Sequence, residues 1–261
     1  MALKLPSLLL TGSLLVLAAA AQAQATFSIG PRLGLNLSNA PFKDQSHSYS
    51  TATRAGAEAG IIANIGFGHF AVQPALLYSQ KGFIVDDTYT LSKNNGSFSQ
   101  TNTTTLLDEY RLNYFTVPLN FVYAQHPDGQ GVEVYAGPYF GLLANGQYSY
   151  DDRYEYQSAF GTTLAVATNK SSGDVGAGDY YTTNRTDTKF YSRSKDAGLQ
   201  FGLGYRKGGF LVQAGYSAGL RNMGADFKVQ YGPNDTRIVP GPSYYNRVFQ
   251  FSLAYLVGPK S

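Results

Sequence analysis

The chain has 261 residues, with 20 Lys and Arg against 17 Asp and Glu, and contains neither Cys nor Trp. Only 14% of the residues are charged, against ~25% in a typical soluble protein, and the abundance of aromatic residues excludes a disordered chain. The lack of Cys excludes a disulfide-stapled domain. A net charge of +3 is too small to indicate a nucleic-acid partner.

The N-terminal segment has the features of a secretory signal peptide. Lys4 supplies a positive charge, residues 8–21 form an apolar run, and residues 21–23 offer a small-x-small cleavage site. The run is shorter than the ~20 apolar residues that a spanning helix needs, so we expect cleavage rather than an N-terminal anchor. The sequence therefore predicts a signal peptide at 1–24 and one mature domain at 25–261.

Alternation of apolar residues with small or polar ones dominates the mature chain, and it is the pattern of a strand with one apolar face. It recurs in eight segments that we predict as strands: 27–37, 57–67, 70–78, 115–123, 132–142, 199–205, 210–220 and 249–257. Short, turn-forming connections alternate with long ones at about 38–53, 81–110, 145–194 and 221–246. This sorting of the loops to two ends is typical of an outer-membrane barrel.

The two faces of these segments decide the orientation. The apolar positions carry no charge, whereas the other positions hold Gly, Ser, Asn, Gln and a few charged residues. A membrane barrel turns the apolar face to lipid and keeps small and polar residues in its narrow lumen. A soluble lipocalin-like carrier, the alternative architecture, would expose its glycine-rich face to water, which weakens strands.

The predicted fold is therefore all-β: an eight-stranded antiparallel up-and-down transmembrane β-barrel with long external loops, in the bacterial outer membrane. Polar residues should fill the lumen of so narrow a barrel; those on lumen positions are Arg32, Glu58, Asn64, Glu133, Gln200, Gln213 and Gln250. Because buried charges must be paired, we expect Arg32 to contact Glu58 or another carboxylate. A solute path lined by these groups is the alternative interpretation.

Aromatic residues gather at the short-turn ends of the strands, on lipid-facing positions. We expect them to form a periplasmic aromatic girdle at the membrane interface; they are Phe27, Phe67, Phe70, Tyr123, Tyr205, Phe210 and Tyr255. The alternative explanation is that these positions are aromatic only because aromatic residues favour strands.

Three local features qualify the pattern. The turn signal at 94–96 has Thr- and Tyr-rich flanks, so we expect the strands around it to continue above the membrane. The Thr, Ser, Gly and Asn-rich stretch 161–185 is predicted to be mobile. Prolines inside strands remove ladder hydrogen bonds, so we expect bulges or bends at Pro31, Pro74, Pro118 and Pro138.

No constellation of reactive residues is apparent. His47, His69 and His126 fall in different connections without metal-ligand spacing, and neither a nucleophile elbow nor a phosphate loop occurs. We therefore expect neither a cofactor nor a metal, and a protein that is not an enzyme.

Six segments of the chain resemble a known family. They are 32–38, 73–82, 111–118, 136–143, 216–222 and 246–255, and together they touch nearly every predicted strand. The chain resembles the PorT-like outer-membrane β-barrel family of Bacteroidetes. The resemblance implies an eight-stranded barrel, and the founding members of the family are linked to type IX secretion. It brings no catalytic residues.

These observations leave three functions open. The first is a non-enzymatic, monomeric barrel that is structural or accessory to secretion or transport, with outer-membrane lipid and envelope or secretion proteins as expected partners. The second is a surface recognition or adhesion barrel that binds through its Tyr-rich external hairpins. The third is the soluble lipocalin-like carrier. An enzyme at the barrel rim would need a nucleophile and a base placed together there.

Overall fold

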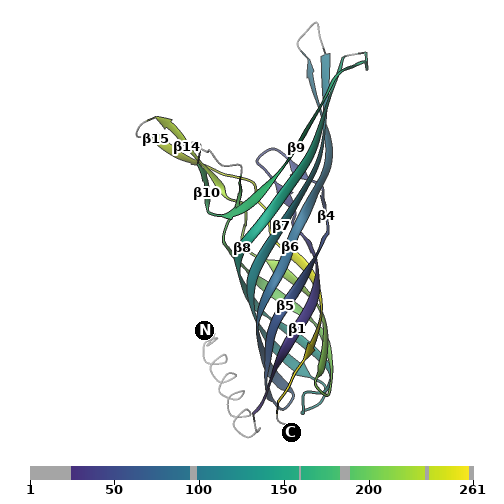
Figure 1. The fold of residues 1–261 in the computed structure, drawn as a ribbon, viewed down its shortest axis with the longest axis vertical. Coiled ribbons are helices and arrows are strands. Elements are labelled where there is room, and N and C mark those ends of the chain that lie inside the picture. The colour runs from purple at the N-terminus through teal and green to yellow at the C-terminus, as the bar shows by residue number, and fades with distance from the viewer. Residues whose placement is uncertain (1–24, 95–98, 159, 183–188, 233–234, 259–261) are drawn as a thin grey trace, which may run out of the picture.

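A computed structural model gives the fold and describes residues 25–94, 99–158, 160–182, 189–232 and 235–258 (Figure 1). All regular secondary structure in these residues is strand. A search of the described residues gives no helix long and apolar enough to span a bilayer. The predicted signal peptide at 1–24 lies outside the described residues.

Eight strands pair in a closed antiparallel ring in the order β1-β5-β6-β7-β8-β12-β13-β16, and β16 returns to pair with β1. Their bounds are β1 (Thr26–Asn39), β5 (Arg54–Phe67), β6 (Phe70–Asn94), β7 (Ser99–Ala124), β8 (Gly131–Ser158), β12 (Lys195–Lys207), β13 (Phe210–Gly219) and β16 (Arg247–Tyr255). Six contain their predicted segment whole, whereas β13 and β16 end one and two residues before the predicted segments 210–220 and 249–257 do. Closure leaves no unpaired edge in the barrel wall, which is the condition for strands to lie in lipid.

The remaining strands belong to the long connections, above the mouth of the barrel (Figure 1). They are β2 (Phe42–Lys43), β3 (Ser48–Tyr49), β4 (Thr51–Ala52), β9 (Thr163–Ala177), β10 (Tyr180–Thr182), β11 (Phe190–Ser192), β14 (Asp226–Gly232) and β15 (Asp235–Val239). The prediction of a mobile 161–185 is wrong for its larger part, because β9 pairs along most of its length with the outer part of β8. Residues 183–188 lie outside the described residues.

The two faces of the wall are as the alternation predicts. Along β1, Leu33 and Leu35 are 65% and 63% exposed, whereas Arg32 and Asn36, which flank them, are 2% and 0% exposed. Small residues on the inner face make room for larger ones: a Cβ at Gly202 or Gly215 would strike the ring of Tyr135. The lipid-facing side is thus apolar, and glycine serves the lumen by its small size.

The prolines do not produce the expected bulges. The residue numbers of paired residues add up to the same total on both sides of Pro74 and of Pro118, so no extra residue is inserted there. Pro31 and Pro138 are themselves paired with residues of a neighbouring strand. Instead, the ladder between β6 and β7 is interrupted at Pro118, which is not paired with Ala75 opposite it. A locally open ladder removes the need for the missing proline N–H without inserting a residue, so the face pattern continues through each proline.

Four strands continue beyond the barrel as one sheet, which we call the projecting sheet: 86–94 of β6, 99–108 of β7, 148–158 of β8 and 163–175 of β9. The β6 and β7 ladder runs to the pair Asn94 with Ser99, as the turn signal predicts. β8 pairs with β12 as far as Leu142 and with β9 from Gly146 onward. This exchange of partners is where the sheet leaves the barrel wall (Figure 1).

Candidate functional site: a filled lumen beneath a projecting sheet

A buried ion pair lies at the centre of the lumen, between adjacent strands β1 and β5. Arg32 Nη2 lies 3.2 Å from Glu58 Oε1, and the two side chains are 3% and 1% exposed. Arg32 Nη1 also donates to Gln213 Oε1 at 3.2 Å, and Ser79 Oγ donates to Glu58 Oε2 at 3.0 Å. The predicted pairing of Arg32 is therefore confirmed, and both charges keep additional hydrogen-bond partners inside the barrel.

A second carboxylate binds an amide cluster nearer the short turns. Gln213 Nε2 donates to Glu133 Oε1 at 2.7 Å, and Gln73 Nε2 donates to Asn64 Oδ1 at 3.0 Å and to Glu133 Oε2 at 3.3 Å. Because Gln213 also accepts from Arg32, the two carboxylates are joined in one network. Charge-assisted hydrogen bonds of this kind compensate the burial of ionised groups.

The remaining predicted lumen residues extend the network across the barrel. Ser217 Oγ lies 2.9 Å from Gln250 Oε1 and 3.3 Å from Gln200 Oε1. Gln200 Nε2 donates to Asn120 Oδ1 at 2.7 Å, and Gln250 Nε2 donates to Glu58 Oε2 at 3.4 Å. All seven predicted lumen residues are buried and hydrogen-bonded within the barrel.

A second ion pair, which the sequence does not predict, lies nearer the long loops. Lys81 Nζ lies 3.2 Å from Asp196 Oδ2, and both side chains are buried. Asn246 Nδ2 donates to the same oxygen at 2.9 Å, and the Lys81 ammonium lies 4.6 Å from the centre of the Tyr139 ring. Lys81 falls in a segment predicted as a loop, and Asp196 lies between the predicted loop 145–194 and the predicted strand 199–205. Continuing the alternation past Ser79 and back from Leu199 would have placed them on the inner face.

The expectation that glycines and amides alone fill the lumen is wrong in part. A cluster of buried apolar residues lies inside the wall, formed by Ile62, Ala75, Leu77, Leu211, Ala254 and Leu256. A larger cluster, rich in aromatic rings, fills the outer mouth: Ala40, Phe83, Val85, Tyr110, Leu112, Tyr114, Leu143, Val175, Met223 and Tyr244. The outer cluster is sealed by Phe42 of β2, whose ring centre lies 5.6 Å from that of Phe83. The barrel is therefore filled by polar and apolar layers.

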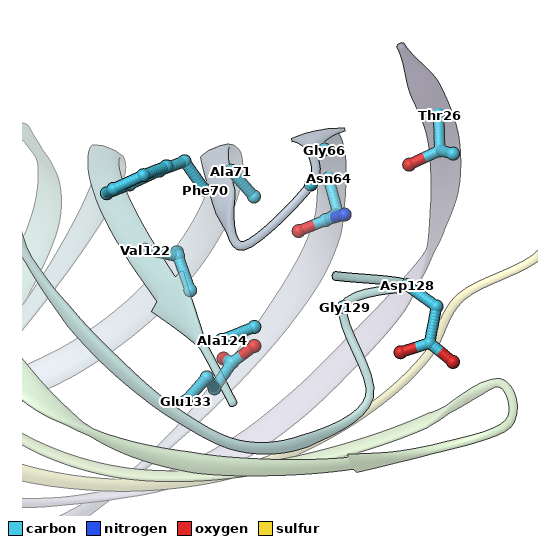
Figure 2. A pocket seen from close by; sticks show the side chains of 11 residues that line it. Thr26, Asn64, Gly66, Phe70, Ala71, Val122, Ala124, Asp128, Gly129 and Glu133 are labelled. Atoms are coloured by element: carbon cyan, nitrogen blue, oxygen red, sulfur yellow. The ribbon is translucent and has the colours of Figure 1, made fainter. Parts of the chain in front are cut away.

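Two hollows lie at the short-turn end: a wide one of about 490 Å³ lined by Ser28, Asp128 and Arg206, and a small one deeper toward Asn64 and Glu133. Figure 2 shows the small one, toward which Asn64 and Glu133 direct polar groups. Its volume is about 10 Å³, close to the minimum that one water molecule requires. Beside it, Arg206 Nη2 donates to Ser28 Oγ at 3.2 Å, which fills the lumen further.

The predicted girdle residues lie where expected, at the short-turn end and outside the wall. Phe27, Phe70, Tyr123, Tyr205, Phe210 and Tyr255 are 47–63% exposed, and Phe67 is half-buried. Two pairs are in edge contact: Phe70 with Tyr123 at 5.4 Å and Phe210 with Tyr255 at 4.9 Å between ring centres. Contacts between aromatic residues on adjacent strands are consistent with an interfacial belt.

The inner face of the projecting sheet carries a close pair of carboxyl groups. Burial first, and then the charge and hydrogen bond of Asp152, raise the pKa of Asp108 to about 7. Asp152 is 8% exposed and accepts a hydrogen bond from the Tyr154 hydroxyl at 3.2 Å. Two buried carboxylates in contact repel, so the pair retains a proton on Asp108.

The projecting sheet has two free edges of different character. The edge of β6 is covered at its base, where Asp86 N–H donates to Ser50 O and His47 lies 2.7 Å from the Asp87 carboxylate, and such charges also discourage strand pairing. Among the described residues, the edge of β9 pairs only at its base, where 175–177 meet β11. Residues 163–170 are exposed on both faces, and 163–169 carry no charge, Gly or Pro. Nothing in the sequence of residues 163–169 discourages an added strand, and the charges of β9 begin only at Lys170.

No match is found among curated proteins. Among solved structures, the chain is similar to Ail of Yersinia pestis, with 8% identity, a TM-score of 0.34 and coverage of 88% of this chain and 99% of that one. It is also similar to Neisserial surface protein A, with 10% identity, a TM-score of 0.31 and coverage of 86% and 96%.

The model of a family described as "Outer membrane protein beta-barrel domain" matches residues 20–224, which is most of the chain. This family match agrees with the closed ring of strands and with the apolar outer face described above. The chain therefore belongs to the outer membrane protein beta-barrel domain family, and the protein is located in the bacterial outer membrane.

Proposed function

We propose that the protein is a non-conducting, non-enzymatic barrel that anchors a recognition surface outside the cell, and that the recognition surface is the projecting sheet. The observation that carries the proposal is the uncharged free edge of β9, held above a barrel that two buried ion pairs and an aromatic cluster fill. We propose that the protein is monomeric, because the closed ring offers no edge in the wall.

The chemistry of the edge identifies the class of partner. An unpaired strand presents a row of backbone N–H and C=O groups, which an extended polypeptide satisfies by adding a strand. Leu164 and Val166 stand on one face of β9, 54% and 48% exposed. They offer apolar contacts to alternate side chains of the added strand. We therefore propose an extended, mainly apolar peptide segment of another protein as the partner.

The experiment uses the purified protein in lipid vesicles and an array of ten-residue peptides. Val166→Lys places a charge on the free edge and should abolish binding of the peptides that the unchanged protein binds. Leu107→Lys is the matched control, because Leu107 lies on a central strand, 49% exposed, where it does not border the edge. Equal loss in both variants indicates binding to the face of the sheet, and unchanged binding by Val166→Lys overturns strand addition.

The filled lumen has its own test in planar bilayers. The protein should give no stable conductance step above background, because charged and aromatic side chains fill the lumen at successive levels. Stable channels that carry small ions would contradict the proposal and favour the solute path.

A role as an accessory of a secretion or transport machine is the second candidate. It is supported by the resemblance of six segments to PorT-like barrels, whose founding members are linked to type IX secretion. Such a role needs an envelope partner at the periplasmic end. A photo-crosslinker at Gln130, which is in the turn between β7 and β8, should then capture one defined envelope protein, and the same crosslinker in β9 should not.

A further inference from the structure

The outward residues at the long-loop end of the lipid-facing surface differ from one side of the barrel to the other. On β6, β7 and β8 the first outward residues beyond the apolar ones are Gln80, Asn113 and Asn145, which are neutral amides. On β12 and β16 they are Lys195 and Arg247, and both are exposed. The cations therefore lie on the side of the rim away from the projecting sheet.

These two cations and Arg221 define a basic patch on one side of the outer rim. β13 lies between β12 and β16, and the register places Arg247 level with Ala218 and Leu199, so Lys195 lies four residues farther along β12 toward the long loops. Arg221 follows β13 at the same end; its one carboxylate contact among the described residues, with Asp179, is at the limiting distance of 4.0 Å. No ion pair is found for Lys195 or Arg247 within the described part of the chain.

Acidic residues do not offset this charge. Every outward position of β12, β13 and β16 is apolar or basic, and Asp196 faces the lumen, where it binds Lys81. By contrast, Arg111 on the other side of the barrel is neutralised by Glu109, with Nε 2.7 Å from Oε1. The rim over β12, β13 and β16 thus keeps its positive charge for a ligand.

An aromatic row lies directly below the cations. Phe201, Tyr216 and Phe249 are cross-strand neighbours on β12, β13 and β16. Their ring centres are 5.9 Å and 4.8 Å apart, and all three side chains face outward. The patch therefore combines cations at the level of the headgroups with a broad apolar surface at the level of the acyl chains.

We propose that Lys195, Arg221 and Arg247 form a binding site for an outer-leaflet lipid that carries phosphate groups on its headgroup. Arg and Lys are the side chains that bind phosphate, and basic residues at a membrane surface attract anionic headgroups. The aromatic row packs against the acyl chains of the same lipid. The site is on the barrel wall and is independent of strand addition at β9.

The test uses nanodiscs of phosphatidylcholine that contain the purified protein and a fluorescent lipid A bearing two phosphates. The double variant Lys195→Gln/Arg247→Gln should bind about 30-fold more weakly, roughly fivefold for each cation removed. Lys207→Gln/Lys228→Gln is the matched control, because it removes the same charge from exposed positions at the short turns and on β14. Heat-modifiable migration on gels confirms that both variants are folded.

Two further lipids identify the chemistry. The same lipid without phosphates should bind the unchanged protein as weakly as lipid A binds the double variant. Phosphatidylglycerol, which also carries phosphate, should compete only at high excess, because a single phosphate contacts fewer of the cations. Equal binding of lipids with and without phosphate, or an equal loss in the control variant, would overturn the proposal.

Discussion

Arg32 and Glu58 illustrate how charges are kept inside a narrow barrel. Each is almost fully buried, and each has a partner beyond the other: Gln213 for the guanidinium and Ser79 for the carboxylate. A buried pair contributes little relative to well-packed apolar residues, but removing one member leaves an uncompensated charge. The main effect of the pair is therefore to determine which residues contact each other in the lumen. Its contribution to net stability is small.

Replacing one member of the pair should destabilise the barrel strongly. We expect Arg32→Met to cost about 3–5 kcal/mol and Arg32→Met/Glu58→Met to recover most of this loss. The measurement is urea unfolding in lipid vesicles, followed by gel mobility because the chain has no Trp. Arg237→Met, which removes an exposed pair with Asp235, should cost under about 1 kcal/mol. A double variant no better than Arg32→Met would show that the pair is not the cause.

Asp108 gives the projecting sheet a dependence on pH. The folded protein holds a proton on Asp108 up to about pH 7, whereas an unperturbed aspartate releases it near 3.8. Between these values the folded state binds more protons, so the stability of the sheet falls as the pH rises.

We expect Asp108→Asn to remove this dependence. Hydrogen exchange in β7 and β8, corrected for intrinsic rates, should show greater protection at pH 5 than at pH 8 in the unchanged protein and equal protection in the variant. Asp86→Asn, at an exposed position of β6, is the control and should keep the difference. If the difference persists in Asp108→Asn, another group is responsible.

At the level of single residues, the alternation of apolar and polar residues predicts well which face of the wall a side chain occupies. It predicts only some of the contacts between side chains. It places Arg32 and Glu58 on the lumen face because both lie within clearly alternating segments, and it leaves open whether Arg32 contacts Glu58 or another carboxylate. It does not reveal Lys81 with Asp196, because both lie where the outward residues turn polar: Lys81 follows Gln80, and Asp196 adjoins Lys195. Which inward residues meet depends on strand register, which face patterns alone do not specify.

At the level of elements, β9 was missed because its Thr, Ser and Gly content is that of a loop. Its strand conformation comes from the ladder with β8, which runs from Gly146 with Val175 to Gln157 with Thr163. The long hairpin of β6 and β7, by contrast, was predicted from its turn signal. Tertiary pairing therefore overrides weak local preference in β9.

The projecting sheet and the barrel should fold as separable units. We expect that replacing 89–104 by Asn-Gly leaves insertion and heat-modifiable migration unchanged, because Phe83, Val85 and Tyr110 of the outer cluster are retained. Asn-Gly is a favoured two-residue hairpin turn. Loss of insertion in this variant would show instead that the hairpin is part of the folding unit.

At the level of the whole molecule, the sequence determines a closed ring with its apolar face outward, and every further inference depends on that orientation. The projecting sheet is held outside the cell, the lumen is filled, and the rim cations meet headgroups only if lipid surrounds the wall. The chain has no Cys, so single cysteines can report the environment of neighbouring positions.

The most direct measurement compares two adjacent residues of β16. Leu253 is 51% exposed and faces outward, whereas Ser252 is 8% exposed and faces the lumen. A polarity-sensitive fluorophore on Leu253→Cys should be quenched strongly by brominated acyl chains, and Ser252→Cys should resist labelling in the folded protein. Strong quenching at position 252 together with none at 253 would contradict the orientation on which this structure is interpreted.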